Sequence, residues 1–353
     1  MQKGERLIII LTNSLTEKSD EGSLKLMSSL IKRIKRDQPQ TELITYNTPH
    51  LLSDYHIEIN KAMISAKLMK RIRRKRESVL FFMTPTRIMN AAIKTLVVSL
   101  YTRGQLTIVL TMPASHVGAI PRLLMKLSRA RMIVTSRDMY ENYSHIFSNE
   151  IYYLKAGIET QKYVPAVPDQ KAELRRKYGI AEDVPVILHV GHMQEGRNIG
   201  KLLELDEQYH IVLVTSTYEQ EKRNLDLRER LKQKRNITLI EHYLPNIEEI
   251  YQLADVYFFP VMDENHCISA PLSVFEAASC NLPIVCTEFG ELKQFKGREG
   301  FFFIDSFDTR NLNDLIDQAL RSSANTRTCV EEYDWDKAVK KVMQIVQGTN
   351  RKE

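Results

Sequence analysis

Glu276 is the one charged residue in the apolar, small-residue segment SAPLSVFEAASCNLPIV at residues 269–285. The run before this segment, Val256–Val261, and the run at its end, Ile284–Cys286, have the length and apolar content of buried strands. A charge between two such strands either faces solvent or binds a ligand.

The residues around Glu276 predict a helix that begins beside a ligand. Pro271 suits the first helical turn, Ser269 can cap it, and Asn281 tolerates the left-handed conformation that ends helices. The start of such a helix presents free N–H groups and a positive dipole end, which together bind phosphate. Glu276, a turn and a half further on, can accept hydrogen bonds from a ribose diol. The alternative is a structural glutamate paired with a nearby Lys or Arg.

A second stretch, VILHVGHMQEGRN at residues 186–198, joins a strand to a glycine and two donors. Gly191 allows close approach of the backbone, and Arg197 offers a planar fork suited to phosphate. His192 adds a further donor where an anion would sit. The alternative is a turn with two surface cations.

The elements that must position these residues form two series. Apolar runs of strand length alternate with amphipathic segments of helix length, and they occur at Leu7–Leu11, Glu42–Tyr46, Val79–Met83, Leu106–Thr111, Met132–Thr135, Ile151–Leu154, Val184–Val190, Ile211–Thr215, Ile237–Ile240, Val256–Val261, Ile284–Cys286 and Phe301–Ile304. A break containing Pro165 and Pro168 separates the sixth run from the seventh. This pattern predicts an α/β protein with two Rossmann-like doubly wound domains, whose ligand lies at the carboxyl ends of the strands in the cleft between them. We place the domains at residues 1–165 and 166–335, with a last helix, 336–353, that packs back on the first domain.

Composition and cysteine usage narrow the class of protein. Hydrophobic content of 43% and charged content of 27% are those of a soluble globular protein. Leu7–Leu11 is too short to span a membrane and lacks the context of a signal peptide. The four cysteines show neither metal-ligand spacing nor a disulfide framework, which favours a cytoplasmic protein.

The charge is unevenly divided. Residues 1–150 hold 24 Lys and Arg against 12 Asp and Glu, a net of +12, whereas the remainder has a net of −6. A basic helical run, KLMKRIRRKR at residues 67–76, is followed by further cations between residues 122 and 131. The expected basic face comprises Lys70, Arg71, Arg73, Arg74 and Arg76. We expect it to meet an anionic membrane surface or a lipid-phosphate acceptor; a solvated helix face is the alternative, and nucleic acid is disfavoured because no recognised motif accompanies the charge.

The motifs together resemble the retaining family-4 glycosyltransferases, the glycogen-synthase-like GT-B enzymes. Gly191, His192 and Arg197 match in spacing the family pattern Gly-Arg-x-x-x-x-Lys, and EAASCNLP at residues 276–283 is similar to the family's second glutamate followed by Gly-Leu-Pro. The segment IYYLKAGIETQKYVP at 151–165 resembles the end of the family's first domain. The similarity covers roughly residues 130–345 and is diffuse before that.

The resemblance implies roles for particular residues. His192 and Arg197 would grip the diphosphate of a nucleotide-sugar, and Glu276 would bind the ribose. The other implied contacts are main-chain or packing contacts, made by Gly191, Ser269, Ala270, Pro271 and Leu272 to the phosphates and sugar and by Tyr243 and Leu244 to the base. No metal or other cofactor is implied, and the Asp334-Trp-Asp336 sequence is interpreted as helix capping.

The chain departs from the family at several positions. Ile268 stands where the family has its first glutamate, which usually contacts the donor sugar; Glu264 and His266 lie nearby in the sequence. The family's histidine near the reacting carbon has one candidate here, His116. The loop after the first strand, with Asn13 and Ser14, is a candidate acceptor-binding loop.

The sequence thus predicts a retaining glycosyltransferase that moves a sugar from a nucleotide-diphosphate donor to a lipid-linked or cell-envelope glycan. We expect it to be cytoplasmic, in a peripheral position at the inner face of the membrane. Two alternatives remain: a non-catalytic GT-B partner subunit and a GT-B sugar-nucleotide epimerase.

Overall fold

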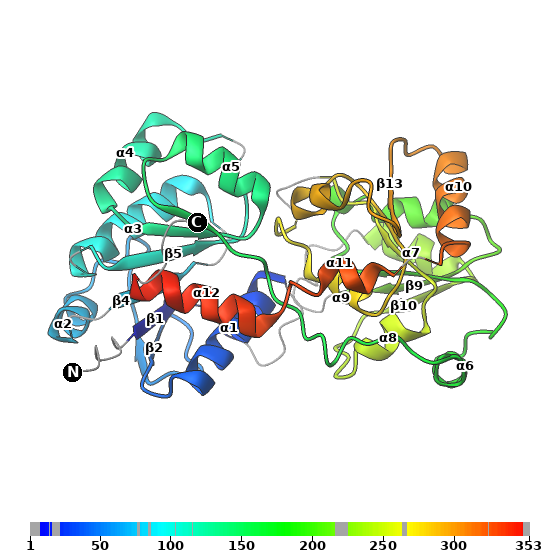
Figure 1. Cartoon of the computed structure of the whole chain (residues 1–353), viewed down its shortest axis with the longest axis horizontal. Coiled ribbons are helices and arrows are strands. Elements are labelled where there is room, and N and C mark those ends of the chain that lie inside the picture. Colours follow the sequence, from blue (N-terminus) through cyan, green and yellow to red (C-terminus); the bar gives the residue numbers. More distant parts are fainter. Residues whose placement is uncertain are drawn as a thin grey trace. The chain divides into compact units, whose positions relative to one another are not determined.

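The computed structural model (Figure 1) describes residues 8–13, 15, 22–75, 78–83, 86–102, 104–114, 116–215, 225–262, 267–323 and 325–348, without the side chains of Arg74, Lys75 and Glu195. The chain divides into two compact units. The first contains the described residues from Ile8 to Leu15, Ser23–Ala156 and the C-terminal segment from Trp335, and the second contains Gly157–Asp334.

The first unit is built on a parallel sheet of seven strands in the order β3-β2-β1-β4-β5-β6-β7. Its strands are β1 (Ile8–Thr12), β2 (Glu42–Tyr46), β3 (Tyr55–Ile57), β4 (Ser78–Phe82), β5 (Leu106–Leu110), β6 (Arg131–Val134) and β7 (Ile151–Tyr153). Its helices are α1 (Gly22–Asp37), α2 (Ala66–Lys75), α3 (Ile88–Thr102), α4 (Ala119–Ser128), α5 (Arg137–Ile146) and α12 (Trp335–Gln347).

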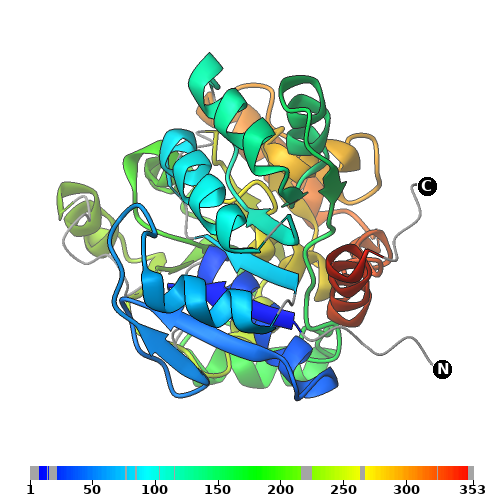
Figure 2. The same ribbon diagram turned by 90° about the vertical axis from the view of Figure 1, so that its left-hand side faces the viewer.

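Helices cover both faces of this sheet, as its apolar strands require. One core cluster joins alternate strand residues to residues of α2, α3, α4 and α5, and α3 packs beside α4 (Figure 2). The other group is α1 with α12, which packs on β4 and β5. Arg33 of α1 lies over the ring of Trp335, 5.3 Å from its centroid, so residues from the two ends of the chain complete one domain.

The second unit has a parallel sheet of six strands in the order β10-β9-β8-β11-β12-β13. The strands are β8 (Val186–Val190), β9 (His210–Val214), β10 (Ile237–Ile240), β11 (Val256–Phe259), β12 (Ile284–Cys286) and β13 (Phe301–Phe303). The α-helices are α6 (Pro168–Lys177), α7 (Leu225–Gln233), α8 (Glu248–Leu253), α9 (Leu272–Ser279), α10 (Thr309–Leu320) and α11 (Thr326–Val330), and three 3₁₀ helices are η1 (Glu195–Arg197), η2 (Ile199–Glu204) and η5 (Gly290–Phe295).

The units meet along the chain at residue 157, earlier than the boundary at 165/166 expected from the prolines. Residues 157–165 belong with the second unit because they are bonded to it. Ile158 forms a β-bridge with Asp334, and the carbonyl of Tyr163 accepts a hydrogen bond of 2.7 Å from the Ser279 hydroxyl. These contacts join residues more than 100 positions apart, which a break in the pattern of apolar runs does not reveal.

The expected strands are all present, with ends shifted by up to two residues. The short edge strand β3 was not expected from the sequence. It follows Asp54, whose carboxylate accepts a 2.7 Å hydrogen bond from the Leu43 N–H of β2, so its place depends on a partner rather than on a run of its own. Among the helices that the structure describes, none is long and apolar enough to cross a membrane.

Candidate functional site

The carboxyl ends of β8 and β11 lie next to each other, because these strands pair in parallel at the centre of the second sheet. The strand order reverses here, and ligands of open α/β sheets bind at such a point. The loop after β8 is joined to the loop after β11 by the Asn198 amide, which donates a 3.0 Å hydrogen bond to the carbonyl of Pro260. The two stretches singled out in the sequence therefore meet at one edge.

Gly191 and Arg197 are in direct contact at this edge. A Cβ atom added to Gly191 would lie 2.5 Å from the Arg197 Nη1 atom, closer than real Cβ contacts. Arg197 is buried, and Asn198, which follows it, has a left-handed backbone with φ of 54° that turns the chain into η2. The absence of a side chain at Gly191 thus makes room for the guanidinium.

Tyr257 of β11 connects the end of β8 with the start of α9. Its hydroxyl donates a 3.2 Å hydrogen bond to the carbonyl of Val190 and also bonds the side chain of Ser273 in the first turn of α9. Burial raises the pKa of this phenol, whereas the nearby charge of Arg197 acts in the opposite direction. One buried tyrosine therefore joins the end of β8 to the N-terminal end of α9.

The start of α9 differs in detail from the sequence-based prediction. The helix begins at Leu272 with Pro271 in the N-cap position and without a side-chain cap, so the prediction that Ser269 caps it is wrong. Instead, the carbonyl of Ser269 accepts a 2.8 Å hydrogen bond from the N–H of Glu291, and Gly290 packs against that carbonyl. The predicted end is confirmed, since Asn281 has φ of 64°.

Glu276 is buried in the second turn of α9, with 3% of its surface exposed. Its Oε2 atom accepts a 3.0 Å hydrogen bond from the hydroxyl of Tyr251 in α8. Burial, followed by the charge of Glu276, raises the pKa of Tyr251 well above its usual value, so this hydroxyl is always a donor. A tyrosine partner is a third possibility, beside the ribose and the Lys or Arg weighed from the sequence.

His189 is a polar residue of this region that the sequence did not indicate. It is fully buried in β8, and its Nδ1 atom lies 2.8 Å from the carbonyl oxygen of Phe258. Burial lowers its pKa to about 4, with Arg197 acting in the same direction. The Nε2 atom has no hydrogen-bond partner in the described part of the chain, and it would lie 3.1 Å from a Cβ at Gly191. In the sequence His189 lies within an apolar strand and is indistinguishable from a structural core residue, so no local pattern indicates a functional role.

The remaining donor-side residues lie around the same edge. Tyr243 is 38% exposed and Leu244 half-buried in the loop after β10, and His192 is half-buried beside Gly191. Ala270 is buried, and so is Ile268, which stands where the resemblance to family 4 leads us to expect a glutamate. Glu264 and His266 lie outside the described residues.

The predicted catalytic residue His116 and the predicted acceptor-loop residue Asn13 lie in the first unit. His116 is exposed on the loop between β5 and α4, and Asn13 follows β1, whereas Ser14 lies outside the described residues.

The basic face expected on α2 is partly occupied by internal contacts. Arg71 pairs with the buried carboxylate of Glu42 and lies 4.4 Å from the ring centroid of Tyr55. Arg73 donates a 3.2 Å hydrogen bond to the carbonyl of Leu100, and Lys70 is exposed. Arg76 and the side chain of Arg74 lie outside the description.

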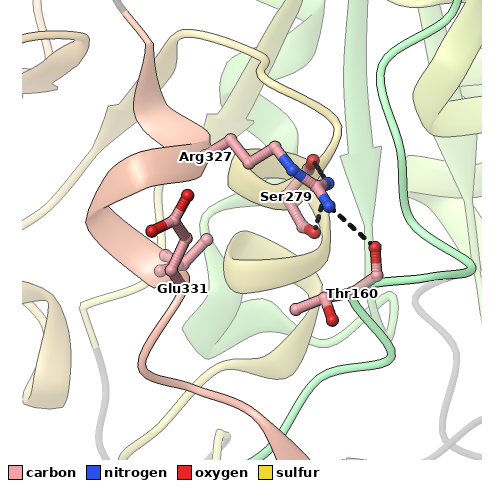
Figure 3. A pocket seen from close by; sticks show the side chains of 5 residues that line it. Thr160, Ser279, Arg327 and Glu331 are labelled. Carbon is pink, nitrogen blue, oxygen red and sulfur yellow. Dashed lines mark hydrogen bonds between the residues drawn. The ribbon is translucent and has the colours of Figure 1, made fainter.

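The described residues contain no group of three or more His, Cys, Asp or Glu that would hold a metal ion. A pocket of about 140 Å³ lies at the other end of α9 and is lined by Thr160, Ser279, Arg327, Val330 and Glu331 (Figure 3). Arg327 lines it and donates hydrogen bonds to main-chain carbonyls, including a 2.9 Å bond to Thr160. At this pocket one arginine therefore joins residues of three segments of the second unit.

Residues 170–334 match the family model described as glycosyl transferases group 1. No curated protein matches the chain. The match confirms the resemblance to glycosyltransferases for the second unit at the level of group 1, and the narrower assignment to family 4 stays a prediction.

Solved structures of glycosyltransferases share the fold over the whole chain. A glycosyltransferase from Rickettsia africae has a TM-score of 0.76 and 13% identity, covering 97% of this chain and 98% of its own. Anabaena Alr3699/HepE in complex with UDP and glucose has a TM-score of 0.74 and 13% identity, covering 97% and 100%. WaaG, a glycosyltransferase involved in lipopolysaccharide biosynthesis, has a TM-score of 0.69 and 14% identity, again covering 97% and 100%. The chain has the GT-B fold, with two Rossmann-like doubly wound domains, as the sequence predicted.

Proposed function

We propose that this group 1 glycosyltransferase is a retaining enzyme that binds a nucleotide-diphosphate-sugar at the carboxyl edge of the second sheet. One observation carries the proposal: the Arg197 guanidinium lies against the bare backbone of Gly191, and Tyr257, whose hydroxyl bonds the adjacent Val190, also bonds Ser273 in the first turn of α9. A guanidinium and a helix N-terminus that share one edge are a diphosphate site.

In this proposal the protein promotes departure of the diphosphate. As the glycosidic bond breaks, negative charge grows on the leaving phosphate oxygens. Arg197, helped by His192 and the N–H groups of Ala270 and Leu272, stabilises that charge more than the charge of the ground state. Glu276 accepts from the ribose hydroxyls through an oxygen not used by Tyr251, and the base packs on main chain at Tyr243 and Leu244. No metal is assigned to this step.

The donor is proposed from the chemistry of the site and from relatives. Anabaena Alr3699/HepE has been solved with UDP-glucose. A diphosphate-sugar donor fits a site with one buried arginine and one helix start, since both groups recognise phosphate oxygens rather than a particular sugar.

The test is ligand stabilisation of the full chain. UDP, GDP, ADP and their glucose conjugates are added one at a time, and the melting temperature is followed. The matching nucleotide-sugar should raise the melting temperature. At a concentration one hundred times its dissociation constant, the ligand should add about 2.7 kcal/mol to the free energy of unfolding. If none of these nucleotides and nucleotide-sugars raises the melting temperature, the proposal that this edge binds a nucleotide-sugar is wrong.

We propose further that the acceptor is a lipid-linked or cell-envelope glycan held by the first unit. The net charge of +12 in residues 1–150 supports an anionic partner, and WaaG, with the same fold, is involved in lipopolysaccharide biosynthesis. The proposal includes a cytoplasmic location at the inner membrane face. Transfer is tested by donor turnover with and without lipid extract from envelope membranes. Turnover that needs no acceptor indicates the epimerase instead.

One observation favours a second candidate, a non-catalytic GT-B partner subunit. Ile268, in the place of the sugar-contacting glutamate, has an aliphatic side chain that offers no hydrogen bond to a donor sugar, and it is buried with 4% of its surface exposed. This candidate is favoured if the protein binds a nucleotide-sugar but does not turn it over when lipid extract from envelope membranes is added.

A further inference from the structure

His189 of β8 carries a buried nitrogen that the proposed function does not use. Its ring is fully buried, and its Nε2 atom has no hydrogen-bond partner among the residues that the structure describes. Buried polar atoms are nearly always hydrogen-bonded, because an unpaired one has lost its contact with water and gained nothing in return. An apolar side chain would fill the same place without this loss, so packing alone does not explain a histidine here.

The hydrogen-bonding character of Nε2 follows from the contact of the other ring nitrogen. Nδ1 lies 2.8 Å from the carbonyl oxygen of Phe258, and a carbonyl oxygen only accepts. Nδ1 therefore carries the hydrogen, and Nε2 of the neutral ring presents a lone pair. Burial lowers the pKa of the ring to about 4, which keeps it neutral at physiological pH. Nε2 is thus an acceptor, and the group that meets it must be an N–H or O–H donor.

The ring of His189 is held in one orientation. It is stacked with the rings of Tyr257 and Phe259, with centroids 6.3 Å and 6.4 Å away, and its Nδ1 is fixed by Phe258. The Tyr257 hydroxyl has a single hydrogen, which it donates to the carbonyl of Val190 at 3.2 Å. The neighbouring phenol therefore does not supply the donor that Nε2 requires.

Nε2 and the Arg197 guanidinium lie close to the same point beside Gly191. A Cβ atom on Gly191 would be 3.1 Å from Nε2 of His189 and 2.5 Å from Nη1 of Arg197. Arg197 is itself buried, and its guanidinium carries five N–H donors and no acceptor. A small rotation of the guanidinium brings one N–H onto the lone pair. The missing side chain of Gly191 thus leaves the space between an acceptor and a group of donors open.

We propose that His189 is a positioning residue for Arg197: its Nε2 atom accepts a hydrogen bond from the guanidinium as Arg197 turns to the donor diphosphate. An N–H held by His189 fixes the plane of the guanidinium, and a guanidinium grips two phosphate oxygens only when they lie in that plane. Support of this kind, from a residue behind the one that touches the ligand, raises affinity by reducing the freedom lost on binding. The proposal rests on the proposed function, because it names the residue that orients the proposed diphosphate ligand.

A purely structural role for His189 is the alternative that the test must separate. In that case the bond from Nδ1 to Phe258 matters, and Nε2 meets a water molecule. Asn and Gln divide the two nitrogens, because the amide of Asn can take the place of Nδ1 and the amide of Gln the place of Nε2. A structural role favours His189→Asn, whereas a positioning role favours His189→Gln.

Calorimetric titration of the full chain measures which of these variants keeps the donor site. The probe is whichever of UDP, GDP and ADP raises the melting temperature of wild type most. His189→Asn should bind it at least about tenfold more weakly, since a hydrogen bond to a charged group is lost. His189→Gln should stay within about threefold of wild type. The matched control is His210→Asn, at a half-buried histidine at the start of β9 whose Nε2 lies 2.9 Å from the Thr238 hydroxyl, and it should bind as wild type does.

Urea unfolding of the same variants reports the structural contribution separately. His189→Asn should be at least as stable as His189→Gln, because it keeps an N–H for Phe258, and yet bind the nucleotide more weakly. This opposite order of stability and affinity is what a positioning role requires. Equal affinities of the two variants, or a higher affinity of His189→Asn, overturn the proposal.

Nuclear magnetic resonance of the chain labelled with ¹⁵N-histidine tests the contact without any nucleotide. The chain has nine histidines, and the signals of His189 are those that His189→Gln removes. They should show a neutral ring protonated on Nδ1 at about pH 7, and Arg197→Met should move the Nε2 resonance more than the Nδ1 resonance. A hydrogen on Nε2, or an Nε2 resonance that does not respond to Arg197→Met, overturns the proposal even if His189→Asn fails to fold. If the contact is seen but no nucleotide stabilises wild type, the proposed function fails and the pairing of His189 with Arg197 stands.

Discussion

At the scale of single residues, the space above Gly191 is what makes room for the Arg197 guanidinium. Gly191→Ala would place a methyl group 2.5 Å from Nη1 and push the guanidinium away. We expect the affinity for the matching nucleotide-sugar to fall by about tenfold, or roughly 1.4 kcal/mol, as measured by calorimetry. Gly200→Ala is the control, since its Cβ would make an ordinary 3.9 Å contact with Leu227. Equal nucleotide-sugar affinities of Gly191→Ala and Gly200→Ala would show that Arg197 does not bind the donor.

The pair of Glu276 and Tyr251 separates a ligand role from a structural one. Glu276→Gln keeps the shape and an oxygen for the Tyr251 hydroxyl but loses the charge, so donor affinity should fall by about tenfold while the fold persists. Tyr251→Phe removes one bond to a charged group, so it should lower the free energy of unfolding by about 1.5–3 kcal/mol. Calorimetry and urea unfolding measure the two effects. Unchanged nucleotide-sugar affinity in Glu276→Gln would show that the carboxylate is only structural.

His189 predicts a pH dependence of stability. Its pKa is about 4 in the folded protein against 6.5 ordinarily, because burial disfavours the charged ring. The unfolded chain therefore binds this proton first as the pH falls. The contribution is complete above about pH 6.5 and is lost between about pH 6.5 and 4, by about 3 kcal/mol in total.

Urea unfolding across that pH range measures the effect. The free energy of unfolding of His189→Phe should decline less steeply than that of wild type, even if its value at neutral pH is lower through loss of the bond to Phe258. His116→Phe, at an exposed histidine, is the control and should keep the wild-type slope. Parallel curves for His189→Phe and wild type would mean that the ring is not buried in its neutral form.

At the scale of elements, Arg327 of α11 holds the segment that enters the second unit against the end of α9. Its Nη1 donates 2.7 Å to the carbonyl of Tyr163 and also bonds Ser279, and its Nη2 donates 2.9 Å to the carbonyl of Thr160 (Figure 3). The planar guanidinium of Arg327 thus supplies the hydrogen bonds that hold these segments together at this junction.

Arg327→Met removes the fork and keeps much of the aliphatic stem. It should lower the free energy of unfolding of the second unit by about 3 kcal/mol, because several buried carbonyls lose a charged donor. The free energy of unfolding of Arg327→Lys should lie between those of wild type and Arg327→Met, since an ammonium cannot reach all three segments in one plane. Arg321→Met, at the exposed end of α10, is the matched control. Urea unfolding measures these free energies. If Arg327→Met loses no more stability than Arg321→Met, the hydrogen bonds of Arg327 do not stabilise the second unit.

At the scale of the whole molecule, the C-terminal helix completes the first unit. Seven residues of α12 are buried, among them Trp335 and Val342. Arg131 of β6 bonds the carbonyls of Ile345 and Val346 near the end of the helix. A single domain therefore depends on segments at both ends of the chain.

Removal of residues 335–353 should abolish cooperative unfolding of the first unit. Each large buried apolar side chain contributes about 1.5–3 kcal/mol, and a whole domain retains only about 5–15 kcal/mol. Calorimetry should show the transition of the second unit persisting and still responding to nucleotide-sugar. A first-unit transition that survives truncation would contradict the role assigned to α12.

The sequence by itself determined the two series of strands, because apolar runs and their helical neighbours are local patterns. The spacing of Gly191 and Arg197 and the left-handed Asn281 are equally local, and these indicated the edge at which the candidate site lies. The matching family model covers the unit in which those local motifs are found.

Only the tertiary structure decided features that depend on partners far apart in the chain. The contact of His189 with the carbonyl of Phe258, the bond from Tyr251 to Glu276 and the ion pair of Arg71 with Glu42 each join separate elements. The exposure of Ile120, Leu123 and Leu127 in α4 is likewise known only from the tertiary structure. The physical reason is that periodicity identifies which residues of a helix share a face, whereas burial depends on which faces other elements cover.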